Sequence, residues 1–177
     1  MKTVTRMAQG SSTARRLLAA SAAVALVLVG AVGAVQASQP TAASGTVIQT
    51  AITGLEVRFA GPNIILEQTT AGSVSGTLSG SYQDSFTVVI HPNGTFSAHG
   101  TLTCECTVDG KSGVVELALT NTGEVLNGIP TFEGRFVING GTGELDGLRG
   151  VLEFEGTVDL QTELSTSTYS GQIHSHP

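Results

Sequence analysis

Basic residues are scarce in this sequence, and the shortage excludes several classes of partner. The chain has 8 lysines and arginines against 14 aspartates and glutamates. Beyond Ala37 four basic residues remain against all fourteen acidic ones, which leaves a net charge of −10. These four are Arg58, Lys111, Arg135 and Arg149. Such a surface repels nucleic-acid phosphates and anionic lipid headgroups, so we expect no nucleic-acid partner and no membrane-surface binding.

Helical periodicity is also missing beyond residue 45. No stretch there sustains apolar residues at a spacing of three to four. Apolar and polar residues alternate instead, most clearly over 95–106, 131–138 and 151–160. This alternation is typical of antiparallel strands with one buried and one solvated face.

Turn signals divide the alternating stretches into about eight strands. Asn93-Gly94 and Asp109-Gly110 are strong hairpin signals. The expected strands lie near 46–53, 55–60, 63–70, 74–90, 94–107, 113–121, 131–138 and 150–160, with 166–174 closing the sheet. Short, evenly spaced strands predict an all-β domain, either a barrel or a sandwich.

A repeated aromatic–any–glycine pattern favours a single antiparallel closed β-barrel. It occurs at 132–134 (FEG), 154–156 (FEG) and 169–171 (YSG). Glycine weakens a strand interior unless the strand must bend sharply, and closed barrels need such bends, covered by an aromatic neighbour. A β-sandwich with incidental glycines is the alternative.

The first 37 residues are predicted to be a secretory signal peptide. Four basic residues precede an apolar run at 17–35, and Val35 and Ala37 stand at the small-residue positions of a cleavage site. The alternative is an uncleaved membrane anchor, because the run is near the minimum length for spanning a bilayer. With cleavage near Ala37 we expect a secreted, extracellular protein with no membrane contact. The export route is left open. We expect residues 38–45 to form a flexible lead-in and residues 46–175 to form the β-barrel domain.

The glycine-rich stretch GGTGELDGLRG (140–150) does not look like a phosphate loop. It lacks the lysine that such loops need, and Glu144 and Asp146 stand where an anion would sit. We expect a connection between strands, with Leu145 and Leu148 tucked under the barrel rim.

Followed by VLEFEGT, this stretch resembles the allene-oxide-cyclase-like barrels, which include plant allene oxide cyclases, dirigent proteins and secreted bacterial domains of unknown function. KSGVVELALTNTGEV (111–125) and TYSGQIHSHP (168–177) are most similar to the bacterial members. The resemblance covers about residues 74–175 and implies an eight-stranded barrel with a central apolar cavity. It also implies isomerisation or cyclisation of hydrophobic small molecules, or orientation of radical coupling. No catalytic residue of the plant enzymes matches a motif here, so no activity is carried over.

An inward apolar phase would place most charged side chains outside and leave a few polar groups within. The residues then expected to line a ligand cavity are Phe86, Phe96, Phe132, Phe136 and Phe154. The polar exceptions, and the candidate catalytic residues, are Asp84, Tyr82 and Tyr169. A carboxyl in an apolar cavity has a raised pKa and suits acid–base chemistry, while a phenol can orient a carbonyl. Alternatively, Asp84 lies at a bulge or rim, bonded to backbone amides.

Cys104 and Cys106 lie two residues apart in a chain expected to be exported. Because an oxidising compartment favours pairing, we predict a local disulfide with the chain bent at Glu105; free buried thiols are the alternative. A metal site needs more ligands than two thiolates, and His99 falls on the opposite phase. We therefore expect no metal and no other cofactor.

The leading hypothesis is a secreted barrel of no enzymatic activity that binds a hydrophobic small molecule or serves as an extracellular scaffold. The first alternative is a cyclase or isomerase of a hydrophobic small molecule that uses Asp84 or a tyrosine. The second is a structural or interaction protein with a packed barrel, including a homo-oligomer. Whether the protein is an enzyme is left open.

Overall fold

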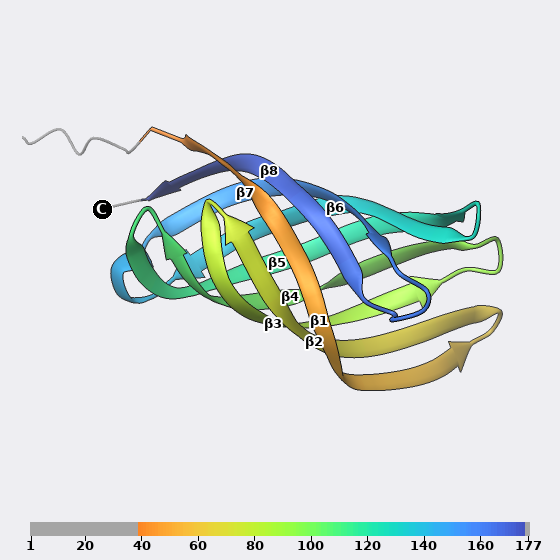
Figure 1. Cartoon of the computed structure of the whole chain (residues 1–177). Coiled ribbons are helices and arrows are strands. Elements are labelled where there is room, and N and C mark those ends of the chain that lie inside the picture. The colour runs from red at the N-terminus through yellow and green to blue at the C-terminus, as the bar shows by residue number, and fades with distance from the viewer. Residues whose placement is uncertain (1–38, 176–177) are drawn as a thin grey trace, which may run out of the picture. The chain divides into compact units, whose positions relative to one another are not determined.

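The computed structural model describes residues 39–175 as one closed barrel of eight antiparallel strands (Figure 1). The predicted signal peptide lies outside these residues. The strands are β1 (Thr41–Ala60), β2 (Asn63–Gly76), β3 (Leu78–Ile90), β4 (Thr95–Val108), β5 (Lys111–Leu126), β6 (Ile129–Gly141), β7 (Leu148–Val158) and β8 (Ser165–Ser175). Each strand pairs with the next, and β1 pairs with β8 to close the ring. The predicted all-β barrel is confirmed, and the sandwich alternative is wrong.

β1 is one strand of 20 residues where the sequence suggested a lead-in and two strands. It begins at Thr41 and pairs with β8 as far as Ile48, so residues 41–45 are strand rather than flexible lead-in. Register shifts between Gln49 and Ala51 and between Ile52 and Gly54 mark irregularities in its pairing with β2. A β-bulge bends a strand and increases its twist without ending it, which explains why 46–53 and 55–60 are continuous.

The expected strand 74–90 is instead divided between β2 and β3. Gly76 has a φ of +106°, a conformation open to glycine and strained for other residues. The chain turns there, and Thr77 bonds back to β1: its N–H donates to the carbonyl of Ser44 at 2.9 Å, and its hydroxyl accepts from the N–H of Ser44 at 3.0 Å.

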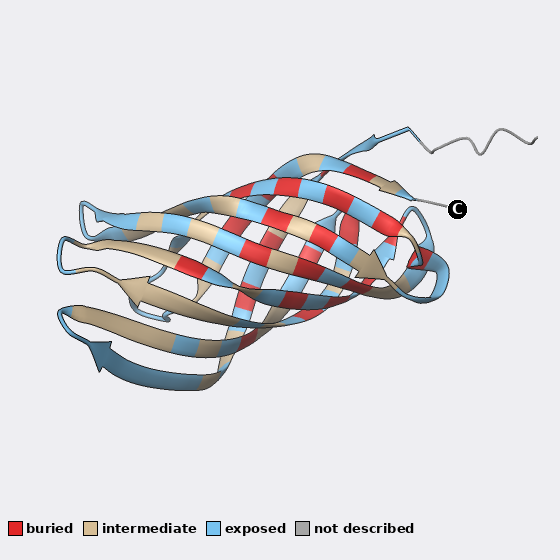
Figure 2. Cartoon of the chain, turned by 180° about the vertical axis from the view of Figure 1, so that it is seen from behind, coloured by how far each residue is buried: buried red, intermediate tan, exposed pale blue. Residues whose placement is uncertain are grey.

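One half of the barrel is packed more densely than the other. Buried residues alternate with exposed ones along the strands and gather in the half that contains the C-terminus (Figure 2). The turns β2–β3, β4–β5 and β6–β7 meet at this end (Figure 1). We call it the closed end. Its buried side chains include Leu78, Val108, Val115, Ile138, Leu148 and Ile173.

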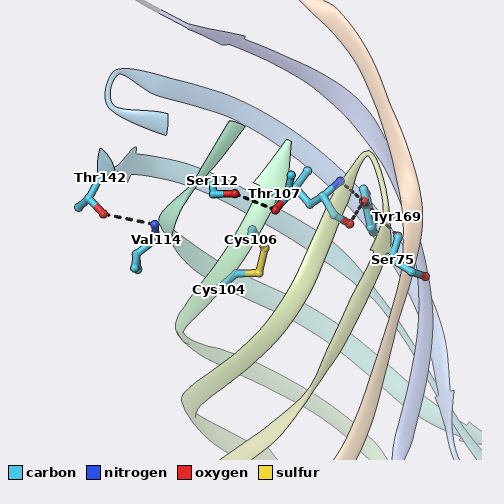
Figure 3. The surroundings of a disulfide bond; sticks show 9 residues. Ser75, Cys104, Cys106, Thr107, Ser112, Val114, Thr142 and Tyr169 are labelled. Carbon is cyan, nitrogen blue, oxygen red and sulfur yellow. Dashed lines mark hydrogen bonds between the residues drawn. A yellow bond between two sulfur atoms is a disulfide. The ribbon is translucent and has the colours of Figure 1, made fainter. Parts of the chain in front are cut away.

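The glycine-rich stretch covers the closed end. A single 3-10 turn at Gly143–Leu145 carries Leu145 into the core, where it is 3% exposed. Thr142 ties the turn to β5, because its hydroxyl accepts the N–H of Val114 at 3.2 Å and its own N–H donates to the Val114 carbonyl (Figure 3). Glu144 accepts the N–H of Ser112 at 3.0 Å, so its carboxylate serves the connection between strands.

Cys104 and Cys106 form a disulfide on the inner face of β4 (Figure 3). Their Cα atoms are 5.3 Å apart, against about 6.6 Å for two steps of a relaxed strand. The strand is therefore compressed locally. Pairing with β3 and β5 continues through Glu105, so the expected bend at Glu105 does not interrupt the sheet.

The other half of the barrel, which we call the open end, has an incomplete wall. β1 pairs with β8 only as far as Ile48, but it pairs with β2 as far as Ala60. One edge of residues 49–60 therefore has no partner strand within residues 39–175. Leu55, Val57 and Phe59 are at least half exposed on this stretch. No helix in the same part of the chain is long and apolar enough to cross a membrane.

Candidate functional site

The open half of the barrel encloses a cavity of about 420 Å³. All five phenylalanines expected from the sequence line it, and so do aliphatic residues such as Leu66, Leu102 and Leu119. The Phe136 and Phe154 rings stack with centroids 4.2 Å apart, and Phe132 meets Phe154 edge-on at 6.0 Å. The cavity reaches the surface, because the half-exposed Leu55 and Leu160 also line it.

Glycines explain why these aromatic rings leave space in the barrel. The ring of Phe96 covers Gly123 on β5, and that of Phe132 covers Gly156 on β7. Tyr82 covers Gly72 on β2 in the same way. Each ring leans across the bare backbone of a neighbouring strand, an arrangement known to stabilise glycines in curved sheets. A ring that packs against the backbone of a neighbouring strand leaves the centre of the barrel unfilled.

Asp84 is the central ionisable group of the cavity. It stands in regular pairing between Thr70 on β2 and Leu102 on β4, so it does not lie at a bulge or rim, although the backbone amide of Thr70 does bond to it, as that alternative expected. Thr70, which is 1% exposed, donates its hydroxyl to Asp84 Oδ1 at 2.5 Å. Burial raises the pKa of the Asp84 carboxyl, although hydrogen bonds from Thr70 oppose the rise.

Tyr82 lies two residues from Asp84 on the same face of β3 and also lines the cavity. Burial raises the pKa of its phenol, the charge of Asp84 raises it further, and a hydrogen bond with Thr70 opposes the change. The phenol therefore stays protonated at neutral pH and can donate a hydrogen bond. Tyr82, Asp84 and Thr70 form one polar cluster in the wall of an apolar cavity.

Tyr169, the third candidate, has a different role. Its hydroxyl accepts the N–H of Leu78 at 3.0 Å, and the carbonyl oxygens of Ser75 and Leu78 lie 3.3 and 3.4 Å from it (Figure 3). These groups belong to the β2–β3 turn at the closed end, and Tyr169 does not line the cavity. Burial raises the pKa of this phenol, and the bond from Leu78 opposes the rise. The side chain binds the turn, and its assignment as a catalytic candidate finds no support in this position.

Two amides of the polar lining, Gln49 and Asn121, have well-defined surroundings. Gln49 is 8% exposed, and its Oε1 accepts both the N–H and the hydroxyl of Ser165, at 3.3 and 2.9 Å. Asn121 Oδ1 is buried and has no hydrogen-bond partner among residues 39–175. Both residues line the cavity. A buried oxygen without a hydrogen bond destabilises the fold, and a donor that reached the Asn121 side-chain oxygen would remove this cost.

Sequence reasoning missed Thr70, Gln49 and Asn121. Asn121 shares the parity of Leu117 and Leu119 on β5, and Thr70 shares that of Leu66 and Gln68 on β2, so alternation alone could have found both. Gln49 sits beside a register shift, where the parity rule fails. Within residues 39–175 no group of three or more His, Cys, Asp or Glu side chains is placed to hold a metal ion.

A closed eight-stranded antiparallel barrel with an interior cavity is thus the class of protein that the structure defines. Among solved structures it is similar to a protein of unknown function from the DUF3224 family of Shewanella oneidensis MR-1. The TM-score is 0.50 at 16% sequence identity, over 78% of this chain and 99% of that one. This likeness concerns the fold alone. No protein-family model and no curated protein matches the chain.

Proposed function

We propose that this protein is a secreted barrel that binds a hydrophobic small molecule in its interior cavity. The observation that carries the proposal is the cavity of about 420 Å³ in the open half. Its volume lies within the range of roughly 300–1,000 Å³ that is usual for small-molecule sites, and an apolar lining with a few polar groups is also usual. The alternative of an interaction protein with a packed interior fits this cavity poorly.

Export is part of the same proposal, and two features support it. The predicted leader at 1–37 has the basic start, apolar centre and small-residue exit of a signal peptide. The Cys104–Cys106 disulfide is chemistry of an oxidising compartment. N-terminal sequencing of the protein from culture medium should begin at Ser38. Recovery only from the membrane fraction, with the leader attached, would favour the anchor instead.

Filling the cavity tests the binding proposal. Ala98 is buried on β4 and lines the cavity, so Ala98→Phe places a ring in the ligand's space. Thr101→Phe adds the same ring on the exposed face of β4 and is the matched control. We expect the neutral fluorescent probe N-phenyl-1-naphthylamine to bind the wild type and Thr101→Phe alike, and Ala98→Phe at least about tenfold more weakly. Equal binding by all three, with unchanged far-UV circular dichroism, would contradict the proposal.

A cyclase or isomerase is the second candidate, and the cluster of Tyr82, Asp84 and Thr70 favours it. A partly buried carboxyl of raised pKa beside a phenol can exchange a proton with a bound substrate, and the cavity can hold a flexible substrate in a reactive conformer. Native mass spectrometry of the protein from its own medium would identify a bound compound. Asp84→Asn should then abolish any conversion of that compound while binding persists. Unchanged conversion would remove Asp84 from the mechanism.

A further inference from the structure

The charged groups around the cavity are all of one sign. Asp84 and Glu163 are the carboxyl residues that line it, and no lysine, arginine or histidine of residues 39–175 does. The basic side chains Arg58, Lys111, Arg135 and Arg149 are all exposed. An anionic ligand would therefore meet repulsion without any compensating cation, both at the Glu163 mouth and at Asp84.

Within the part of the chain that the structure describes, Asp84 also lacks a cationic partner. Thr70 is the side chain that bonds to it among the described residues, and a carboxylate removed from water is costly unless it is paired. In most proteins a lysine or arginine supplies the pairing charge. Here the space beside the carboxyl is cavity rather than protein, so a bound molecule can supply it.

Two acceptor groups of the lining are compatible with the same kind of ligand. Asn121 Oδ1 is a buried acceptor without a donor, and Asp84 is an acceptor when ionised. An ammonium group carries three N–H donors and no acceptor. The negative charge of the cavity lining is complementary to such a group.

We propose that the ligand is a lipophilic amine whose ammonium group pairs with Asp84 while its apolar part occupies the phenylalanine-lined cavity. The inference rests on the binding function proposed above. It excludes fatty acids and other apolar anions as the preferred ligands, although their apolar parts would fit equally well. Pairing inside the cavity is a charge-assisted hydrogen bond, and such bonds are stronger than those between neutral groups.

Three probes with one apolar chain test this inference. Dodecylamine, dodecanol and dodecanoate are titrated below micelle formation, in physiological salt, against N-phenyl-1-naphthylamine bound to the protein as recovered from its producing cells. We expect the amine to bind about tenfold to a hundredfold more tightly than the alcohol, and dodecanoate to bind most weakly. Asp84→Asn should reduce the preference for amine over alcohol to less than about threefold.

Glu105→Gln is the matched control, because it removes one carboxylate from the exposed face of β4, outside the residues that line the cavity. It should keep most of the preference for the amine. Equal binding of amine and alcohol by the wild type, or a preference that survives Asp84→Asn, would overturn the amine inference and leave the binding function standing. Failure of all three probes and of the fluorescent probe to bind would overturn both.

Discussion

Removal of one hydroxyl, in Tyr169→Phe, should destabilise the barrel by a predictable amount. The phenol oxygen is the acceptor for the backbone N–H of Leu78, and both residues are buried, at 4% and 2% exposure. Phenylalanine keeps the ring and its packing but leaves that N–H without a partner. The substitution therefore removes the hydrogen bonds that join the β8 hydroxyl to the β2–β3 turn, and the bond from Leu78 spans 91 residues of sequence.

The size of the loss follows from burial. An orphaned buried donor costs about 1–3 kcal/mol, more than the net value of an ordinary hydrogen bond. For a domain of about 140 residues the entropy of unfolding is roughly 0.3 kcal/mol per degree. The melting temperature should therefore fall by about 3–10 °C.

Tyr82→Phe is the matched control, because Tyr82 is also a buried inner-face tyrosine, at 5% exposure. Its hydroxyl interacts with Thr70, and Thr70 keeps its bond to Asp84 when that hydroxyl is removed. Urea unfolding followed by far-UV circular dichroism should give a loss below about 1 kcal/mol for Tyr82→Phe. Equal losses for the two variants, at unchanged urea slopes, would refute the role given to the Tyr169 hydroxyl.

Three further changes test other parts of the structure. Burial raises the pKa of Asp84 above its ordinary 3.8, so the ionised carboxyl lowers the free energy of unfolding once the pH rises through the folded-state pKa, and it has no such effect below pH 3.8. Asp84→Asn should therefore stabilise the protein against urea near neutral pH but not near pH 3. An equal stabilisation at both pH values would contradict this. Gly134→Ala should lower the free energy of unfolding by about 1–3 kcal/mol, because the added Cβ would meet the backbone carbonyl of Thr120. Gly140→Ala on the same strand is the control, since the atom near its Cβ is the flexible end of Arg149, at 3.4 Å. Similar melting temperatures for the two variants would refute the close approach of Gly134 to the Thr120 carbonyl. Reduction of the disulfide, which leaves both buried sulfur atoms in place, should cost about 1.6 kcal/mol from loss of a three-residue loop, and a several-fold larger loss in urea unfolding would mean that the bridge stabilises more than its own strand.

Much of the fold could be predicted because the decisive signal is local. Alternation assigns a face to each residue without knowledge of its neighbours, and it placed Asp84, Tyr82 and Phe154 on the inner face as the structure does. Hairpin turns such as Asn93-Gly94 similarly set the order of the strands. When every connection is short, a hairpin turn pairs each strand with the next one along the chain. The period of two then sets the face of each residue.

What could not be predicted depends on register and on neighbours in space. Tyr169 has the inward parity of a cavity residue, but its position along the barrel is set by pairing with β1 and β7, and that places it at the closed end. The course of β1 was missed because residues 49–54 contain register shifts that their sequence does not signal. The identity of the glycine under each aromatic ring is likewise a property of the assembled sheet.

The cavity has an energetic consequence for the whole barrel. An enclosed, empty space of about 420 Å³ would cost about 10 kcal/mol at roughly 24 cal/mol per Å³, which is comparable to the entire stability of an ordinary domain. Such a cavity is sustainable only if water or a ligand occupies it, and its mouth beside Leu55 and Leu160 allows either.

The net stability must then come from the closed end, where Leu145, the disulfide and the Tyr169 bonds gather. A ligand that displaces water from the open half adds to it by mass action, about 2.7 kcal/mol at a hundredfold excess over its dissociation constant. The melting temperature should therefore rise with ligand concentration in the wild type, and not in Ala98→Phe, whose cavity is filled. A rise of equal size in both would mean that the ligand binds elsewhere on the protein.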